Sequence, residues 1–384
     1  MRKMAIETIH EKNRIVDNII NALQDRSQFL ILGHRNQDED CIASMVAIGL
    51  LVGKFTKKAH LFLSESIHEH FKYLLDICRH NSIGCGRMPD EWGEGTDAIV
   101  VCDTPKPSMI DSDAAVERLM AVAGTLVIEI DHHIGGDSEY IGSEGYRLVT
   151  EATSSSELVG QIALKIGKRP EILERYNIQN LLSRNLVLAI LTGIVGDTNM
   201  GQFIKSKRQR RYYDIFVNLY NSLLVRETIN ETNFMNKEQV FHEIQRLSTV
   251  EERCSRYLSD RTRISGPIAY VLLDRNDMKQ LSAEFDPDTI VSVSRSMADR
   301  LAEESGRLGM VAYDDSDGSG LIQFRLRRSH RFKTFDLRRV LEIFSIQNGG
   351  GHEGAIGFRV KPEDAPDLKG FVDRLLHGIE KAIA

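Results

Sequence analysis

Four short apolar runs constrain the fold most, because longer helical patterns separate them in the first part of the chain. They read FLILG at 29–33, AHLFLS at 59–64, DAIVVCD at 97–103 and TLVIEID at 125–131. Continuous apolar strands that alternate with helices are typical of a parallel sheet whose two faces are both covered. We therefore expect an α/β fold, with an N-terminal parallel sheet that carries helices on both faces.

Side chains that can bind metal ions follow these runs. In parallel sheets, functional groups gather beyond the carboxyl ends of the strands. An isolated acid at such a place is commonly a helix cap or a turn residue, but acids and histidines at several strand ends together favour a metal site. The candidates are His34, Asp38 and Asp40 after the first run, Asp103 at the end of the third, Asp131, His132 and His133 at the end of the fourth, and Asp197 after the apolar stretch 186–195.

The spacing of the acids suits two divalent ions of the Mn²⁺ or Mg²⁺ kind. Asp38 and Asp40 share one loop, and their side chains leave the backbone in different directions. Asp103 could bridge the two ions at the separation of about 3.5–4 Å that is common in two-metal phosphoesterases. Such a centre would generate a hydroxide and bind a phosphate between the same two ions.

A second, smaller domain is expected in the C-terminal part. Strand-like runs return at 266–274, 306–315 and 320–329, with an amphipathic helix around 288–303. The preceding segment is polar, lacks Gly and Pro, and is typical of one or two connecting helices. The expected division is a metal-binding catalytic domain at 1–226, a helical linker at 227–262, and a mixed-sheet α/β domain at 263–384.

Charge and composition narrow the class of partner. The 384 residues carry a net charge of −6, so no overall basic field favours long double-stranded nucleic acid, and a nucleic-acid substrate should be short. Five cysteines without a C-x-x-C pair favour reduced thiols in a cytoplasmic protein. The longest apolar run, 186–196, is too short to cross a membrane, so we expect a soluble protein without a membrane partner.

Taken together, the motifs resemble those of the DHH phosphoesterases. HRNQDED (34–40), VVCDTP (100–105), EIDHHIGG (129–136) and GIVGDTNMGQF (193–203) match the four family motifs in order. EATSSSELVG (151–160) is similar to the family's serine-rich stretch, and NGGGHEGAIGF (348–358) to the signature of the DHH-associated C-terminal domain. The resemblance implies that one ion is held by His34, Asp38 and Asp103, and the other by Asp40, Asp103, His132 and Asp197.

The resemblance also implies roles beside the ions. His133 would face the substrate phosphate and act in catalysis together with Asp103, while Asp131 would orient a neighbouring ligand. Two positions depart from the family pattern, since Gln37 replaces a common Pro and Ala43 a common Gly. Neither change removes a ligand, but both leave the geometry of the first loop open.

Two features of the C-terminal domain are predicted to bind substrate. Arg325 and Arg327 lie on one face of a strand by its period of two, and guanidinium groups bind phosphate well. Arg328 and Arg331 are better explained as an exposed basic edge strand. Successive glycines let backbone N–H groups approach an anion, so the resemblance makes Gly349, Gly350, Gly351 and His352 a substrate-binding loop.

The resulting hypothesis is an Mn²⁺-dependent phosphodiesterase, with Mg²⁺ as the alternative ion. It would cut short linear dinucleotides such as pGpG or pApA to mononucleotides, as nanoRNases do, by attack of a metal-bound hydroxide. A cyclic dinucleotide phosphodiesterase and a 3′-phosphatase for pAp are the enzyme alternatives. A nucleotide-binding regulator without catalysis is the alternative of another class, and a homodimer stays open.

Overall fold

The computed structural model describes residues 1–384 except 66, 90–91, 123, 228–233, 235 and 384. The chain forms two compact units, Met1–Arg246 and Leu247–Ala384. Their boundary falls within the segment 227–262 for which we predicted a helical linker. Part of that segment, 228–233 and 235, lies outside the described residues, and the remainder contains α10 (Lys237–Ile244) and α11 (Thr249–Ser259).

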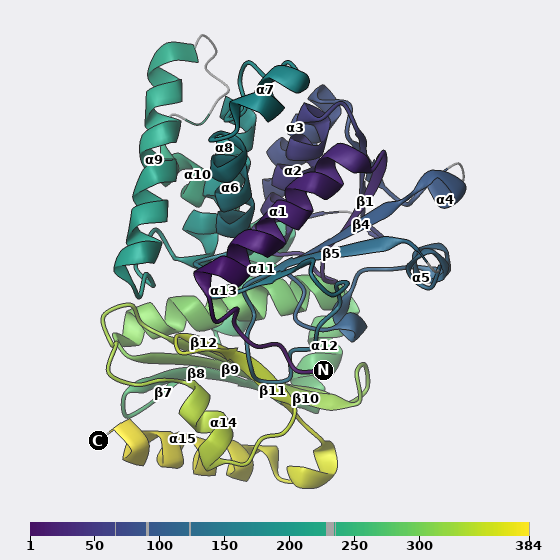
Figure 1. The fold of residues 1–384 in the computed structure, drawn as a ribbon. Helices are drawn as coiled ribbons and strands as arrows, with labels where there is room; N and C mark the ends of the chain where they lie inside the picture. The colour runs from purple at the N-terminus through teal and green to yellow at the C-terminus, as the bar shows by residue number, and fades with distance from the viewer. Residues whose placement is uncertain (66, 90–91, 123, 228–233, 235, 384) are drawn as a thin grey trace. The chain divides into compact units, whose positions relative to one another are not determined.

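The first unit is built on a six-stranded parallel sheet in the order β3-β2-β1-β4-β5-β6. Its strands β1, β4 and β5 are labelled in Figure 1. The four predicted runs form its four longest strands. The two outer strands, of three residues each, were not predicted. The strands are β1 (Gln28–Leu32), β2 (Lys58–Phe62), β3 (Gly84–Gly86), β4 (Ala98–Cys102), β5 (Leu126–Asp131) and β6 (Arg147–Val149).

Helices cover both faces of this sheet, which confirms the expected fold class. In β1, Phe29 and Ile31 belong to the larger hydrophobic cluster, whereas Leu30 and Leu32 belong to the cluster on the opposite face. The larger cluster is completed by α1 (Ile9–Asp25), α2 (Glu39–Lys54), α3 (Lys72–His80), α6 (Ser155–Ile166), α7 (Pro170–Arg175), α8 (Arg184–Asp197) and α9 (Lys207–Glu227), and the smaller by α5 (Ala114–Met120).

The strand order places the functional loops. From β1 the chain builds outward to β2 and β3, and then returns so that β4 pairs with β1 on its other side. The loops after β1 and β4 therefore leave the sheet in opposite directions, which is where ligand sites of open α/β sheets lie. His34 and Asp103 follow these two strands directly, apart from Gly33.

The second unit contains a mixed six-stranded sheet in the order β11-β12-β10-β9-β8-β7. Only β8 and β9 pair in parallel; the other described pairs are antiparallel. One face packs on α14 (Arg338–Ile343) and α15 (Leu368–Ile383), and the other on α11, α12 (Arg275–Glu284) and α13 (Pro287–Ser305). The strands are β7 (Thr262–Ser265), β8 (Ile268–Leu273), β9 (Leu308–Asp315), β10 (Leu321–Arg328), β11 (Gly349–His352) and β12 (Ala355–Val360).

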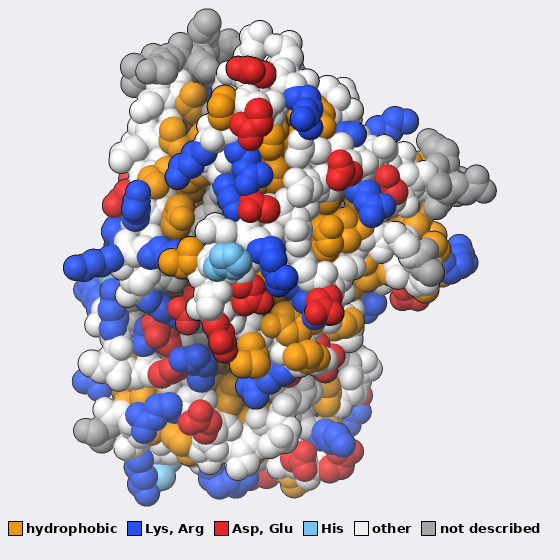
Figure 2. All heavy atoms as spheres, viewed as in Figure 1, with side chains coloured by type: hydrophobic (Ala, Val, Ile, Leu, Met, Phe, Trp, Pro, Cys, Tyr) orange, Lys and Arg blue, Asp and Glu red, His pale blue; other side chains and the backbone are white. Residues whose placement is uncertain are grey.

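The surface and the cysteines bear on the class of protein. Acidic and basic side chains are interspersed over the face shown in Figure 2. None of the helices within the described ranges is long and apolar enough to cross a membrane. The five cysteines are free thiols, and four of them are buried.

Candidate metal centre

Six predicted metal ligands come together at the carboxyl edge of the parallel sheet. His34, Asp103 and His132 follow the neighbouring strands β1, β4 and β5. Asp38 caps α2, where its side chain accepts a hydrogen bond from the backbone N–H of Cys41. The remaining two are Asp40, in the first turn of α2, and Asp197, the last residue of α8.

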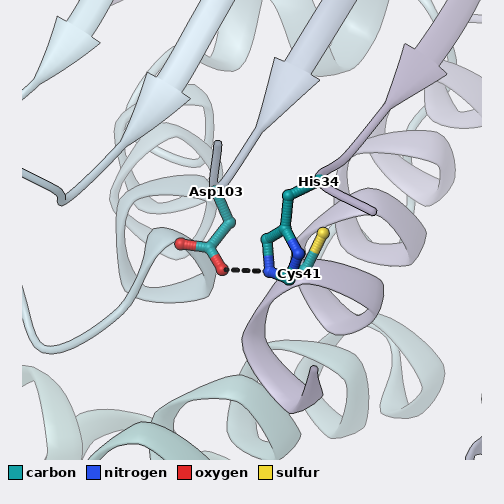
Figure 3. A group of neighbouring side chains, drawn as sticks. All are labelled: His34, Cys41 and Asp103. Carbon is teal, nitrogen blue, oxygen red and sulfur yellow. Dashed lines mark ion pairs between the residues drawn. The ribbon is translucent and has the colours of Figure 1, made fainter. Parts of the chain in front are cut away.

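Asp103 lies at the middle of this cluster. Its Oδ2 is 3.8 Å from Nε2 of His34, and its Oδ1 is 3.3 Å from Nε2 of His132. Figure 3 shows the His34 and Asp103 side chains pointing toward each other from neighbouring strand ends. Asp103 is 2 % exposed, and its φ of 48° is rare for a residue with a side chain. Because its two oxygens face different histidines, the carboxylate is placed as a bridge between two ions would be.

A second group surrounds His132. Its Nε2 is 3.3 Å from Oδ2 of Asp197 and 3.9 Å from Oδ2 of Asp40. On the other side of Asp103, Nε2 of His34 is 3.5 Å from Oδ1 of Asp38. The two groups share Asp103 and agree with the two ligand sets that the sequence motifs imply, although the assignment of ions to them stays a prediction.

The amino terminus of α6 supports the carboxylates, a feature that spacing alone did not reveal. Asp40 accepts hydrogen bonds from the backbone N–H groups of Ser155 and Ser156, the latter at 2.9 Å. The hydroxyl of Ser155 donates to Oδ1 of Asp103 at 3.0 Å. A helix amino terminus stabilises negative charge, so this contact holds two acids in place. The triple serine at 154–156 was the available signal, but only as part of the family resemblance.

The cluster carries more negative charge than its protein partners compensate. Burial, together with the nearby Asp103, raises the pKa of Asp40 to about 7. Burial likewise raises the pKa of Asp197 well above its ordinary value, although His132 opposes the change. In the metal-free protein, protons therefore bind readily to these two carboxylates, whose negative charge a divalent cation would otherwise offset. Carboxylate oxygens and imidazole nitrogens are suitable donors for Mn²⁺ or Mg²⁺, so the residues fit the implied ions.

Cys41 is a neighbour of the centre that the sequence did not single out. Cys41 lies in the first turn of α2, and its side chain stands beside His34 (Figure 3). One possible ligand atom from each of Cys41, His34 and Asp103 lies within 4.8 Å of the other two. Burial raises the pKa of the Cys41 thiol to about 11, so it remains protonated at neutral pH. The thiol therefore adds no charge to the oxygen and nitrogen donors.

Asp131 and His133 form a pair at the end of β5. Oδ1 of Asp131 accepts a hydrogen bond from the backbone N–H of His133 at 3.1 Å, and it lies 2.8 Å from Nδ1 of the same residue. Burial opposes ionisation of Asp131, but His133 and then Lys3 hold its pKa well below the ordinary value. The His133 side chain is 37 % exposed against 17 % for His132, so His133 is the more accessible of the two.

The departure at Gln37 has a structural explanation. Its Nε2 donates a hydrogen bond to Oδ2 of the buried Asp111 at 3.0 Å, and the backbone N–H of Asp111 donates to the carbonyl of Gly33 at 2.8 Å. These bonds attach the loop after β1 to the loop after β4. A long-range contact thus restrains the loop where proline would restrain it locally. Ala43 is buried within α2.

In the second unit, Arg325 is a half-buried cation on β10 whose buried Nε has no hydrogen-bond partner among the residues that the structure describes. Burial lowers its pKa to about 10, Tyr313 opposes the change, and Arg295, Arg327 and Arg359 add to it. Its guanidinium lies over Gly357, where a Cβ would come within 2.5 Å of a guanidinium nitrogen. No motif in the sequence had marked Arg295 or Arg359 as a binding residue.

Arg327, by contrast, is paired. Its Nε lies 3.2 Å from Oδ1 of Asp299 on α13, and its Nη1 donates to the carbonyl of Ile356 at 3.3 Å. The two predicted arginines therefore point their charges into different surroundings. Both remain predictions as substrate ligands.

Two expectations about the second unit are wrong, and the first of them concerns the glycine-rich segment. Gly349–His352 form the edge strand β11, paired with β12, and not a loop. Three glycines are typical of turns, but here Gly351, at a φ of 135°, brings its backbone so close to Ala355 that a Cβ would collide with the Ala355 carbonyl. The predicted roles of Gly349, Gly350, Gly351 and His352 in substrate binding stay predictions, now for an edge strand.

Arg328 does not belong to an exposed edge strand. It is 5 % exposed, and its Nη1 donates to the carbonyl of Phe335 at 2.7 Å. The reason is that β10 lies inside the sheet, between β12 and β9, so its last side chain points into the unit. Arg331 is exposed but lies beyond the end of the strand.

Two family models match the chain. The model described as DHH family, N-terminal domain, matches residues 28–194, and the DHHA1 domain model matches residues 277–378. The first contains β1 to β6 and, apart from Asp197, every candidate ligand of the metal centre. No curated protein is similar enough to the chain to count as a match.

Several solved structures align with this chain. An exopolyphosphatase-related protein from Bacteroides fragilis aligns with a TM-score of 0.65 at 17% identity, covering 97% of this chain and 98% of that one. RecJ from Thermus thermophilus in complex with Mn²⁺ aligns at 0.44 and 15% identity, over 97% of this chain and 55% of that one. The pGpG-specific phosphodiesterase PggH from Vibrio cholerae aligns at 0.37 and 10% identity, over 92% and 99% respectively.

Proposed function

Because the chain belongs to the DHH family, with an N-terminal DHH domain followed by a DHHA1 domain, we propose that it is a metal-dependent phosphodiesterase that hydrolyses short linear dinucleotides to mononucleotides. The observation that carries the proposal is the position of Asp103, whose buried carboxylate lies between His34 and His132. A structural ion pair would need only one cationic partner, whereas a carboxylate with acids and histidines on both sides suits two cations.

Each residue of the centre has a task under this proposal. His34, Asp38, Asp103, Asp40, His132 and Asp197 would hold two divalent ions, Mn²⁺ in preference to Mg²⁺. Such ions supply a nucleophilic water and offset the charge of the phosphate. The N–H groups of α6 keep Asp40 from turning away. Nδ1 of His133 is engaged by Asp131, which leaves its Nε2 to face the substrate phosphate.

The arginines of the second unit support a small nucleotide as the substrate. Arg325 has a buried donor without a partner, and Arg295, Arg327 and Arg359 are close enough to influence its charge. Guanidinium groups of this kind bind a terminal phosphate through charge-assisted hydrogen bonds. The net charge of −6 does not favour a long strand. We infer that Arg295, Arg325, Arg327 and Arg359, which we call the arginine face, bind a phosphate of the nucleotide.

The test is a comparison of substrates with the purified, Mn²⁺-loaded protein. pGpG, pApA, longer oligonucleotides, cyclic dinucleotides, pAp and polyphosphate are offered side by side, and mononucleotide or phosphate release is measured. We expect the highest kcat/KM for linear dinucleotides and no activity in the Asp103→Ala variant.

Each other outcome rejects part of the proposal. Preference for a cyclic dinucleotide, pAp or polyphosphate would overturn the substrate assignment and leave a phosphoesterase. Tight binding of dinucleotides without product formation would make the protein a nucleotide-binding regulator.

A further inference from the structure

A lysine ammonium group is buried beneath the metal centre. Nζ of Lys3 donates to the carbonyl of Thr104 at 2.6 Å and forms ion pairs with Glu129, at 2.8 Å, and with Asp131. The Lys3 side chain is fully buried. Burying an ammonium group is costly unless it is paired and hydrogen-bonded, and here three acceptors from two strand ends surround it.

The backbone around Lys3 is fastened to the loop that carries the DHH histidines. We call residues 1–6 the N-terminal strap. Lys3 N–H donates to the carbonyl of Ser138 at 3.1 Å, and Gly135 N–H donates to the carbonyl of Lys3 at 3.3 Å. Arg2 and Glu139 form an antiparallel bridge. The strap therefore runs along the segment that follows His133.

Lys3 separates two buried acids of one strand face. Glu129 and Asp131 are two residues apart on β5 and are both 0 % exposed. The backbone N–H groups of Ile141 and Gly142 satisfy Oε2 of Glu129, whereas within the described part of the chain its Oε1 is matched by the Lys3 ion pair alone. The ammonium group is thus a cation placed between these two neighbouring carboxylates.

Asp131 divides its two oxygens between Lys3 and His133. Oδ2 pairs with Lys3, while Oδ1 lies 2.8 Å from Nδ1 of His133. A carboxylate only accepts hydrogen bonds, so this contact places the proton of a neutral His133 on Nδ1 and leaves Nε2 unprotonated. Partners of this kind commonly fix the orientation and tautomer of histidines in metal centres.

We propose that Lys3 is a positioning residue for the active site, which holds Asp131 and through it the tautomer and orientation of His133. The same ammonium group also holds the carbonyl of Thr104, the residue after Asp103. One side chain from the strap therefore braces two of the loops that carry the metal centre. The expected effect of Lys3 on kcat rests on the proposed function, whereas its expected effect on the His133 tautomer does not.

The experiment compares four changes in the full-length protein. Lys3→Met removes the ammonium group, Asp131→Asn removes its partner, and the double variant tests whether the two act as one unit. Tyr140→Phe is the matched control, because Tyr140 Oη bonds both the N–H and the carbonyl of Met4, at 3.0 Å each, without touching Lys3 or Asp131. If Lys3→Met does not fold, Lys3→Met/Glu129→Gln removes the excess charge, with Glu129→Gln as its reference.

Two readouts are taken. Steady-state kinetics on the dinucleotide with Mn²⁺ give kcat and KM separately. Nitrogen-15 NMR of histidine-labelled, metal-free protein at about pH 8.5, where an ordinary histidine is neutral, reports the tautomer of His133.

We expect Lys3→Met to lower kcat about 10- to 100-fold with KM within about twofold, a loss of the size seen when outer groups of a metal centre are removed. The kcat of the double variant should be no lower than that of Asp131→Asn. In Lys3→Met, His133 should change from the Nδ1–H tautomer to a mixture of the two tautomers. Tyr140→Phe should keep the wild-type kcat and tautomer.

Equal losses in Lys3→Met and Tyr140→Phe, additive losses in the double variant, or an unchanged His133 tautomer would overturn the inference. If the wild type hydrolyses none of the substrates offered, the proposed function fails instead, and the tautomer comparison alone decides the role of Lys3.

Discussion

The metal centre of the first unit and the arginine face of the second differ in how their buried charges are compensated. Asp40 is fixed by two backbone N–H groups of α6, and Asp131 by Lys3 and His133, so the acids cannot move freely. Arg325 has no partner at Nε and lies among other cations. In the first region burial and a neighbouring acid favour the protonated form of Asp40, whereas in the second Arg325 lies near other cations. We therefore predict that the first region sets the rate and the second the affinity.

The largest effect is expected for Asp103→Asn. The amide cannot bridge two cations, so kcat for pGpG should fall about 10³-fold, the loss typical for removal of a main electrostatic contact. Removing a carboxylate beside Asp40 also relieves repulsion, so the Tm of the metal-free protein should not decrease. Activity is measured with Mn²⁺, and unfolding by circular dichroism. A variant that retains a tenth of the wild-type kcat would show that the first region does not set the rate.

The next largest effect is expected for Arg325→Met, which should weaken the binding of the dinucleotide. Loss of a charge-assisted contact worth about 1.5–3 kcal/mol should raise KM for the dinucleotide roughly 10- to 100-fold, with kcat little changed. The free energy of unfolding should not fall, because the buried Nε has no partner to lose. The control is Arg331→Met, an exposed residue beyond β10. An equal rise in KM in both variants would mean that the arginine face is not a specific binding site.

The metal centre and the arginine face should also differ in how their ligand affinity depends on pH. The pKa of Asp40 is about 7 in the folded, metal-free protein, so below pH 7 this carboxyl is mostly protonated and Mn²⁺ must displace the proton. The apparent Kd should therefore rise by about tenfold for each pH unit below 7. Isothermal titration calorimetry at several pH values measures it. Dinucleotide binding to the arginines should show no such step, and a flat Mn²⁺ affinity between pH 5 and 7 contradicts the predicted competition.

The smallest effect is expected for Gln37→Ala. It removes the hydrogen bond to Asp111, so the free energy of unfolding should fall by about 0.5–1.5 kcal/mol and kcat by a few-fold. Gln37→Glu should cost more, because it places a second carboxylate beside Asp111. Urea unfolding ranks the three proteins. If Gln37→Glu is as stable as the wild type, the contact does not restrain the loop.

Much of the fold was predictable because its signals are local. Runs such as 29–32 and 98–102 form strands buried on both faces, so their apolar character is continuous and easy to detect. The short strands β3 and β6 leave too little sequence for such a pattern. The Gly-rich run at 349–352 misled us, because glycine permits both a turn and the close strand approach that occurs there.

The side of the sheet that a residue faces was harder to predict. Arg325, Arg327 and Arg328 are nearly adjacent, yet one lacks a partner, one pairs with Asp299, and one is buried against the carbonyl of Phe335. The period of two that placed Arg325 and Arg327 on one face of the strand did not distinguish these fates. They follow from the neighbours of β10 in the sheet and from the helix that covers each part of it.

The sequence by itself determined which donor types the metal centre contains, because acids and histidines at the ends of parallel strands must meet at one edge of the sheet. Only the tertiary structure decided how those donors are held. Lys3 reaches Asp131 across 128 positions of sequence, and Ser156 reaches Asp40 across 116. Contacts at such separations leave no periodic trace in the chain, since they depend on how helices and strands pack and not on the conformation of either segment alone.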